Sequence, residues 1–438
     1  MRVLLLADVC NPDWPSLPIV GYKYAKAIAN HADVVVATQI RNQPNITRDG
    51  LGSAEVVYLD TEKIAAPISK LAAKLRGGPQ KAWTLQMAMD YPTYLAFEWY
   101  AWQRFKQELK AGEFDLVHRI TPMTPTLPSL MASRSPVPFV LGPLNGNLPW
   151  PSAFQAELKR EKEWLSKFRK FYKWLPFYRS TYGRSQAVLG AFDHTISDFP
   201  RSILDQVINV PEVGIDPEVF SPTVRPKRDR MTILYAGRLV PYKLPEVVVQ
   251  AFAKSPLLQQ HRLVIAGDGP ERPRLERVIA DHNLSHCVEL VGHQPQAKIG
   301  ELMREAEIFA FPSIRELGAG VVVEAMACGM ACVVVDYGGP ATLIGADRGV
   351  KVPLGTFDTI VDRFVQEMEG LVVDPTRVRQ LGQTAYEHAM TYYSWDAKAR
   401  KTLEIYDWVL GKTSAKPNFW EQPRWEQNPE QPNLFQEV

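Results

Sequence analysis

The sequence predicts an α/β protein built from two doubly wound domains, each with a parallel sheet between helices. Three observations lead to this prediction: the length of the chain, a repeated alternation of apolar runs with helical patterns, and one break in that alternation. The chain has 438 residues, which is more than a single core usually holds. Strands that are buried on both faces read as continuous apolar runs, and strands that alternate with helices form a parallel sheet.

The first domain is predicted to span residues 1–222. Its expected strands are short apolar or β-branched runs, in order "RVLLLADV", "ADVVVAT", "AEVVYLD", "FDLVHRI", "PFVLGP" and "DHTIS". Helical patterns such as "GYKYAKAIANH" and "AFEWYAWQRFKQELKAG" lie between them. After Pro222 the polar, charged stretch "TVRPKRDR" interrupts the alternation and predicts a linker.

The second domain is predicted to span residues 223–392. The alternation restarts there with the segments "MTILYAG", "LPEVVVQAFAKS", "HRLVIAG", "CVELVG", "EIFAFPS", "GVVVEAMACG" and "ACVVVD". A last helix, at about 393–411, is expected to pack back on the first domain. The remaining residues, 412–438, are rich in Pro, Gln, Asn and Glu, and we expect them to be a disordered tail.

Composition excludes several classes of protein. Hydrophobic residues make up 46% and charged residues 22%, which is typical of a globular chain, and the net charge of +2 gives no sign of a nucleic-acid partner. The four cysteines indicate a reducing compartment. Cys328 and Cys332 lack a second ligand pair, so we interpret them as core residues and expect no metal. The apolar stretches are too short for a signal peptide or a membrane span, which predicts a cytoplasmic protein or one peripheral on the inner membrane face.

Candidate site residues follow the strands of the second domain, because ligands bind at the carboxyl ends of parallel strands. After "MTILYA" come Gly237, which permits close approach of a ligand, and the cations Arg238 and Lys243. An Arg fork and a Lys point charge together suit a diphosphate. The alternative is a solvated loop with surface cations.

Two further strand ends carry glycines. Gly267 and Gly269 follow "HRLVIA" directly and can expose backbone amides to a ligand, although an ordinary turn between strand and helix remains the alternative. Glu316 lies in the loop after "EIFAFPS", and the next residues are again small: Gly318, Ala319 and Gly320.

A helix is predicted to begin after that glycine-rich loop, with Val321 in its first turn and Glu324 soon after. Amide groups at a helix start hold anions, and a nearby carboxylate accepts hydrogen bonds from hydroxyls. Glu324 is therefore a candidate for two ribose hydroxyls, as acidic residues are in other nucleotide folds. The alternatives are that Glu324 caps its helix or forms a buried pair.

Together these pieces resemble the family 4 retaining glycosyltransferases, which have the GT-B fold. The matching segments are "YAGRLVPYK", "VIAGDGPE", "VGHQP", "AEIFAFPSIRELGAGVVVEAMACGMACVVVDYGGP" and "YYSWDAKARKTLEIY", and they occur in the family's order over about residues 230–410. The resemblance implies two Rossmann-like domains that face a cleft. It also implies that Glu324 holds the nucleotide ribose, that Glu316 approaches the donor sugar, and that the two cations stabilise the leaving diphosphate without a metal or cofactor.

The first domain matches the family less closely. Its first loop, "NPDWPSLPIVG", lacks the family's glycine pair, and Ile120 stands where a second histidine often follows His118. These departures concern the acceptor side and leave the donor site as it is. His118, Asn145 and Gly146 are the candidates there, with a satisfied core histidine as the alternative for His118.

A basic aromatic stretch spans residues 156–185, "AELKREKEWLSKFRKFYKWLPFYRSTYGRS". A helix with cations on one side and aromatics on the other can lie in a membrane interface, whereas the alternative is a helix that packs its aromatics on its own domain.

We therefore predict a retaining hexosyltransferase that uses a UDP or GDP sugar and a carbohydrate or lipid-linked acceptor, in polysaccharide or glycolipid assembly. Other enzymes of the same fold, a phosphorylase or a sugar-nucleotide epimerase, stay open. So does a non-catalytic member that binds a sugar nucleotide or partners an active transferase.

Overall fold

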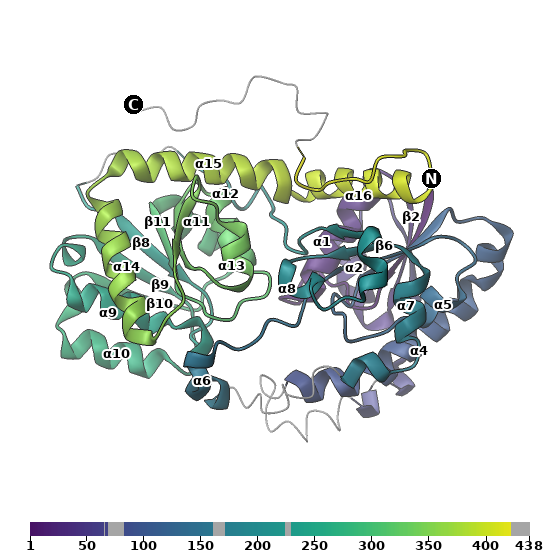
Figure 1. Ribbon diagram of the computed structural model, residues 1–438, viewed down its shortest axis with the longest axis horizontal. Helices are drawn as coiled ribbons and strands as arrows, with labels where there is room; N and C mark the ends of the chain where they lie inside the picture. Colours follow the sequence, from purple (N-terminus) through teal and green to yellow (C-terminus); the bar gives the residue numbers. More distant parts are fainter. Residues whose placement is uncertain (65, 69–82, 161–170, 224–228, 422–438) are drawn as a thin grey trace. The chain divides into compact units, whose positions relative to one another are not determined.

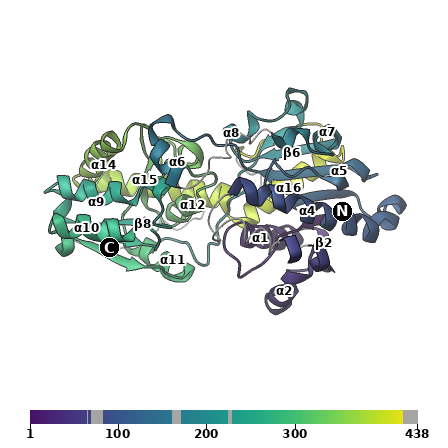
Figure 2. The same cartoon turned by 90° about the horizontal axis from the view of Figure 1, so that it is seen from below.

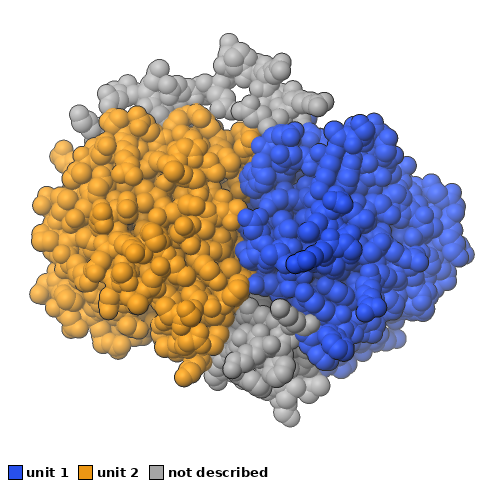
Figure 3. Space-filling view, in the orientation of Figure 1, with its two compact units in different colours: residues 1–147, 161–214, 395–421 blue, residues 148–160, 215–394, 422–438 orange. Residues whose placement is uncertain are grey.

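A computed structural model describes residues 1–64, 66–68, 83–160, 171–223 and 229–421. The chain forms two compact units, which Figure 3 distinguishes by colour. Among the described residues, unit 1 comprises 1–147, 171–214 and 395–421, and unit 2 comprises 148–160 and 215–394. Each unit has its own parallel sheet.

Unit 1 is built on a seven-stranded sheet with the order β3-β2-β1-β4-β5-β6-β7. All of its strand pairs are parallel. Its strands are β1 (Arg2–Ala7), β2 (Asp33–Gln39), β3 (Glu55–Leu59), β4 (Leu116–Thr121), β5 (Phe139–Leu144), β6 (Ser185–Gly190) and β7 (Val207–Asn209).

One strand prediction in this unit is wrong. The segment "DHTIS" contains α8 (Asp193–Ile196), a single helical turn, and the strand of this region is β6, which lies just before it. The amides of Thr195 and Ile196 both donate to the carbonyl of Phe192, at 2.9 and 3.0 Å, so these β-branched residues are used in a turn and not in a ladder.

Helices cover both faces of the first sheet. Successive side chains of a strand point to opposite faces. Val117 of β4 packs in the core that also holds Phe97 and Phe105 of α4 (Trp83–Ala111). The next residue, His118, contacts Tyr406 of α16 (Trp395–Val409). The helices α4 and α16 therefore lie on opposite faces of this sheet.

Unit 2 is built on a six-stranded sheet with the order β10-β9-β8-β11-β12-β13, also parallel throughout. The order reverses between β8 and β11, which makes their carboxyl ends the expected ligand edge. Its strands are β8 (Thr232–Ala236), β9 (Arg262–Ala266), β10 (Val288–Gly292), β11 (Ile308–Phe311), β12 (Ala331–Val335) and β13 (Gly349–Val352).

The remaining helices connect these strands (Figures 1 and 2). In unit 1 they are α1 (Leu17–Ala29), α2 (Gln43–Asp49), α5 (Leu130–Arg134) and α7 (Tyr178–Arg184). In unit 2 they are α6 (Gln155–Arg160), α9 (Pro245–Lys254), α10 (Arg272–Asp281), α11 (Gln296–Glu305), α12 (Gly320–Ala327), α13 (Gly338–Leu343), α14 (Phe357–Val372) and α15 (Pro375–Tyr393).

The division between the units differs from the predicted boundary after Pro222. Ile215 already belongs to unit 2, where its amide donates to the carbonyl of Tyr393 at 2.8 Å. Residues 224–228 of the predicted linker lie outside the described residues. A second difference is that residues 148–160, in the middle of the predicted first domain, belong to unit 2.

The carboxyl-terminal region differs in part from the predicted disordered tail at 412–438. The last long helical stretch is two helices, α15 in unit 2 and α16 in unit 1, with Ser394 between them. Beyond α16 the structure describes the chain as far as Glu421, and Phe419 is buried beside the ammonium group of Lys398. The rest of the predicted disordered tail, 422–438, lies outside the described residues.

Candidate functional site

The strongest cluster of candidate residues lies at the carboxyl ends of β8 and β11 in unit 2. These neighbouring strands bring together two loops that are far apart in the sequence, Gly237–Lys243 and Pro312–Glu316. The two loops also bond to each other, because the amide of Ile314 donates to the carbonyl of Tyr242 at 2.9 Å.

Lys243 and Glu316 form an ion pair at the centre of this cluster. The Nζ of Lys243 lies 2.8 Å from Oε2 of Glu316, and the lysine side chain is only 9% exposed. The ammonium group also lies 4.9 Å from the ring centroid of Phe311. A buried cation is costly unless it is paired, and Glu316 supplies that partner for Lys243.

Arg238 is the more exposed of the two predicted cations. Its Nη2 donates to the hydroxyl of Tyr242 at 2.7 Å. A hydrogen bond from β8 fixes the main chain of the same loop, since the hydroxyl of Tyr235 donates to the carbonyl of Arg238 at 3.2 Å. Arg238 is therefore held by hydrogen bonds of both its side chain and its main chain. The remaining N–H groups of its guanidinium can donate to an anion.

The two glycine-bearing strand ends touch each other. A Cβ on Gly267 would lie 1.9 Å from the carbonyl oxygen of Gly237, and a Cβ on Gly269 would lie 2.4 Å from that of Leu239. Only glycine fits at both positions, because real Cβ atoms do not come this close to backbone. The "GDGP" turn is thus built to pack against the loop that carries Arg238.

The predicted helix after the glycine-rich loop is α12, which begins at Gly320. Ala319 precedes it with a φ of 50°, a left-handed conformation in which a residue other than glycine is strained. Val321 lies in the first turn, as predicted, and Glu324 follows it. Glu324 is half-buried and accepts a hydrogen bond of 3.3 Å from Nε2 of Gln296.

The structure thus brings most predicted donor-side residues to one edge of unit 2. They are Gly237, Arg238, Lys243, Gly267, Gly269, Glu316, Gly318, Ala319, Gly320, Val321 and Glu324. Two oppositely charged groups, one exposed Arg and several glycine amides can receive an anionic ligand that also carries hydroxyls.

His118 in unit 1 is a core histidine. It is fully buried, with Nδ1 2.6 Å from the hydroxyl of Tyr406 and Nε2 2.7 Å from the carbonyl of Gly142. Burial lowers its pKa to about 3. Ile120, at the family's second histidine position, is fully buried as well.

Asn145 and Gly146 follow β5 in unit 1. The side chain of Asn145 donates to Glu212 and lies 3.3 Å from Nε2 of His194. The amide of Gly146 donates to the hydroxyl of Thr195 at 3.0 Å. Asn145 is only 7% exposed, so its polar groups serve the protein itself in this structure.

Sequence reasoning missed several aromatic and basic residues of the unit 2 cluster. Tyr242 lies between the two cations of "GRLVPYK", and the signal for it is its position in that motif. Trp150 comes from residues 148–160, and its ring lies under the guanidinium of Arg315 at 5.0 Å. No local pattern signals that Trp150 belongs with the strand ends of the other unit.

No metal centre is seen within the described ranges: they hold no group of three or more His, Cys, Asp or Glu side chains arranged to bind an ion. Cys328 and Cys332 are both buried thiols. In the same ranges, none of the helices combines the length and the apolar character that crossing a membrane requires.

Comparison with known families confirms the resemblance over the second unit. The model of the family described as glycosyl transferases group 1 matches residues 218–388, and the family 4 assignment fits that family. Two curated relatives each match 45% of this chain. A D-inositol 3-phosphate glycosyltransferase of Kribbella flavida is 28% identical over 219 residues, which are 45% of this chain and 50% of that protein.

The second relative is one subunit of a phosphatidylinositol N-acetylglucosaminyltransferase from Arabidopsis thaliana. It is 27% identical over 201 residues, which are 45% of this chain and 43% of that protein. The chain therefore spans about half the length of the curated relatives it matches.

A solved structure is similar over nearly the whole chain. Anabaena HepE in complex with UDP and glucose superposes with a TM-score of 0.58 over 92% of this chain and 99% of that one, at 14% identity. With the two parallel sheets described above, this similarity confirms the GT-B fold with its two Rossmann-like domains.

Proposed function

We propose, from the membership of residues 218–388 in the group 1 glycosyl transferases, that the protein transfers a sugar from a nucleotide diphosphate sugar to a hydroxyl acceptor with retention of configuration. The observation that carries this proposal is the Lys243–Glu316 ion pair beside Arg238 at the β8/β11 edge. The two cations and the carboxylate come from loops that follow neighbouring strands, and this edge of a parallel sheet is where a diphosphate sugar is expected to bind.

The two cations are assigned to the leaving diphosphate. Negative charge grows on that group as the glycosidic bond breaks, so Arg238 and Lys243 stabilise the transition state more than the bound donor. Lys243 is already fixed by Glu316 at 2.8 Å, and Arg238 by Tyr242 at 2.7 Å, so neither cation has to be reorganised during the reaction. We assign no metal to this step, because these cations supply the positive charge.

The carboxylates are assigned to the rest of the donor. Glu324, half-buried in the second turn of α12, accepts hydrogen bonds from the ribose hydroxyls. Glu316, which is ion-paired with Lys243, is assigned to the donor sugar. UDP and GDP sugars are the donors that we would test first, and the phosphatidylinositol relative supports testing a lipid-linked acceptor beside a carbohydrate one.

A peripheral membrane contact is part of the proposal and rests on the described part of 156–185. The stretch is not one helix: α6 ends at Arg160 in unit 2, residues 161–170 lie outside the described residues, and α7 starts at Tyr178 in unit 1. In the described residues just before α7, the side chain of Phe171 is 69% exposed and that of Trp174 is 85% exposed. Aromatic side chains favour the interface between lipid and water.

The membrane contact is tested by sedimentation with phosphatidylglycerol vesicles. The protein should pellet with them at low salt and be released as salt rises, and the double variant Phe171→Ala, Trp174→Ala should pellet less. Sedimentation that is equal for the variant and the parent would contradict a role of these two side chains.

Activity is tested with purified protein and UDP-, GDP- and ADP-sugars. Release of nucleoside diphosphate, by transfer or slow hydrolysis, should be seen with one class of donor, and NMR of the first-formed product should show the donor's anomeric configuration. Binding without any turnover would contradict the catalytic proposal and favour a non-catalytic sugar-nucleotide binder.

A further inference from the structure

Residues 148–160 follow a segment of unit 1 in the sequence but belong to unit 2 in the structure. We call this segment the strap. The helix α6 of the strap packs against η5 (Pro241–Lys243), and Figures 1 and 2 show α6 among elements of unit 2. The strap runs along the strand-end loops that carry the proposed donor site, so it is positioned to shape that site.

The strap touches these loops at its beginning. Leu148 is 2% exposed and packs against Gly338, where a Cβ would lie 2.7 Å from Cδ2 of the leucine. The hydroxyl of Tyr337 donates to the carbonyl of Pro149 at 3.0 Å. Tyr337 precedes α13 and Gly338 begins it, just after β12, which is next to β11 in the sheet.

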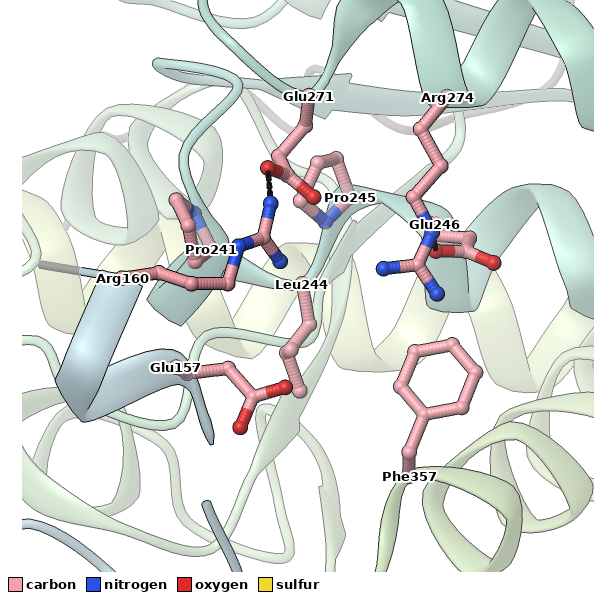
Figure 4. A pocket seen from close by; sticks show the side chains of 9 residues that line it. All are labelled: Glu157, Arg160, Pro241, Leu244, Pro245, Glu246, Glu271, Arg274 and Phe357. Carbon is pink, nitrogen blue, oxygen red and sulfur yellow. Dashed lines mark hydrogen bonds and ion pairs between the residues drawn. The ribbon is translucent and has the colours of Figure 1, made fainter. Parts of the chain in front are cut away.

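An ion pair holds the other end of the strap. Arg160 of α6 is paired with Glu271, which is 4% exposed and follows the "GDGP" turn (Figure 4). A second pair, between Arg274 and Glu246, lines the same small pocket. Breaking a pair that contains a buried carboxylate is costly, so this contact anchors the strap on unit 2.

Trp150 lies between the two ends of the strap. The edge of its ring meets Tyr242, with centroids 6.5 Å apart and planes at 88°, and the guanidinium of Arg315 lies 5.0 Å from the ring. Its indole nitrogen is buried and has no hydrogen-bond partner among the described residues. The ring therefore acts through its faces and edge, and not through a hydrogen bond.

We propose that Trp150 is a positioning residue of the donor site: it holds Tyr242, and through Tyr242 it directs Arg238 toward the diphosphate. The chain of contacts is short, because Arg238 donates to the Tyr242 hydroxyl at 2.7 Å. Tyr242 precedes Lys243 in the sequence, and Arg315 precedes Glu316. The ring of Trp150 therefore contacts both of the loops that form the Lys243–Glu316 ion pair. The proposal rests on the function proposed above.

The first test does not depend on a ligand. Hydrogen exchange of the unliganded full chain should become faster in residues 237–243 and 312–316 in Trp150→Ala, and it should stay as in the parent in Trp150→Phe, which keeps an aromatic ring. Trp99→Ala is the control, since Trp99 carries a similarly placed Arg134 at 5.4 Å in unit 1. Unchanged exchange of both loops in Trp150→Ala would overturn the proposal.

The second test measures how strongly the protein prefers a nucleoside diphosphate to the matching nucleoside, using whichever of UDP, GDP and ADP it binds. Trp150→Ala should lower this preference about three- to tenfold, on the scale of one aromatic contact, while Trp150→Phe should keep it. An equal loss in both variants, or no loss in Trp150→Ala, would overturn the proposal. If Trp150→Ala does not fold, Trp150→Leu takes its place.

A double-mutant cycle separates positioning from general loss of packing. Tyr242→Phe removes the hydroxyl that Arg238 uses and keeps the ring that Trp150 contacts. In that background, Trp150→Ala should cause no further loss of diphosphate preference. Additive losses would show that Trp150 does not act through Tyr242. If the parent bound none of the three diphosphates, the proposed function would fail, and the exchange test would still decide the role of Trp150.

Discussion

The two units place similar loops at the carboxyl ends of similar sheets, but they use these loops differently. In unit 1 the polar groups within β4 and just after β5 are used internally: His118 is bonded through both ring nitrogens, and the side chain of Asn145 donates to Glu212. In unit 2 the loops after β8 and β11 present charge, with Arg238 exposed and Lys243 paired to Glu316. The shared topology therefore gives each sheet a possible ligand edge at the carboxyl ends of its strands. The side chains at that edge determine which of the two sheets can bind an anionic ligand, and this favours unit 2.

The largest effect is expected at the charged edge of unit 2. Lys243→Ala and Arg238→Ala should each lower kcat by about 10²–10³, with a smaller effect on donor binding, because the cations act on charge that develops in the transition state. Arg238→Lys should not restore the parent value, since lysine lacks the planar fork. The measurement is kcat and KM with the native donor.

The matched control for these variants is Lys254→Ala. Lys254 is in the same unit and pairs with Asp362 at 2.7 Å, but it lies on the exposed surface at the end of α9. Near-parental kcat in both site variants, in proteins with unchanged circular dichroism, would show that the two cations do not act on the leaving diphosphate.

A smaller loss is expected at Glu324. Glu324→Ala should weaken binding of the free nucleoside diphosphate by roughly 1.5–3 kcal/mol, the usual value for a charged hydrogen-bond partner. Calorimetric titration measures this loss. Glu301→Ala is the control, because Glu301 is an exposed carboxylate paired with Lys298 at 2.7 Å. Unchanged nucleotide affinity in a folded Glu324→Ala protein would exclude the ribose role.

For the buried His118 of unit 1 we expect an effect of pH on protein stability, and not an effect on catalysis. The pKa of His118 is lowered by burial to about 3 in the folded chain, from its ordinary value near 6.5. Below pH 6.5 the unfolded chain binds a proton that the folded chain excludes. The free energy of unfolding should therefore fall as pH decreases from 6.5 toward 3, by up to about 1.4 kcal/mol per pH unit from this group.

His118→Gln isolates that contribution, because glutamine does not titrate. Urea unfolding at pH 6.5, 5.5 and 4.5 should show a flatter pH dependence for the variant than for the parent. Parallel curves for the two proteins would mean that His118 titrates normally and is not held as the structure shows.

Sequence patterns predicted the fold class because buried parallel strands need continuous apolar runs, as in "MTILYA" and "ACVVVD". They failed for "DHTIS", where β-branched residues form a turn, and for β6, whose run includes Ser185, Gln186 and Gly190. The start of α12 was predictable from the loop "GAG". Each of these successes and failures depends on local sequence.

The contacts inside the site depend on pairing between distant segments, which local patterns do not contain. Lys243 and Glu316 were predicted as separate contacts to a ligand, and only the adjacency of β8 and β11 joins them as an ion pair. Trp150 reaches the same edge because residues 148–160 belong to unit 2, although the described residues on both sides of them in the sequence belong to unit 1. Their roles toward a donor stay predictions.

The most direct measurement is hydrogen exchange of the full chain with and without the nucleoside diphosphate that it binds. Protection should appear in residues 237–243, 267–271 and 312–324 of unit 2, where the proposed donor site lies, and residues 118–124 and 145–147 of unit 1 should exchange as before. Protection in the two unit 1 segments, with none in the three unit 2 segments, would contradict the assignment of the donor site to the charged edge of unit 2.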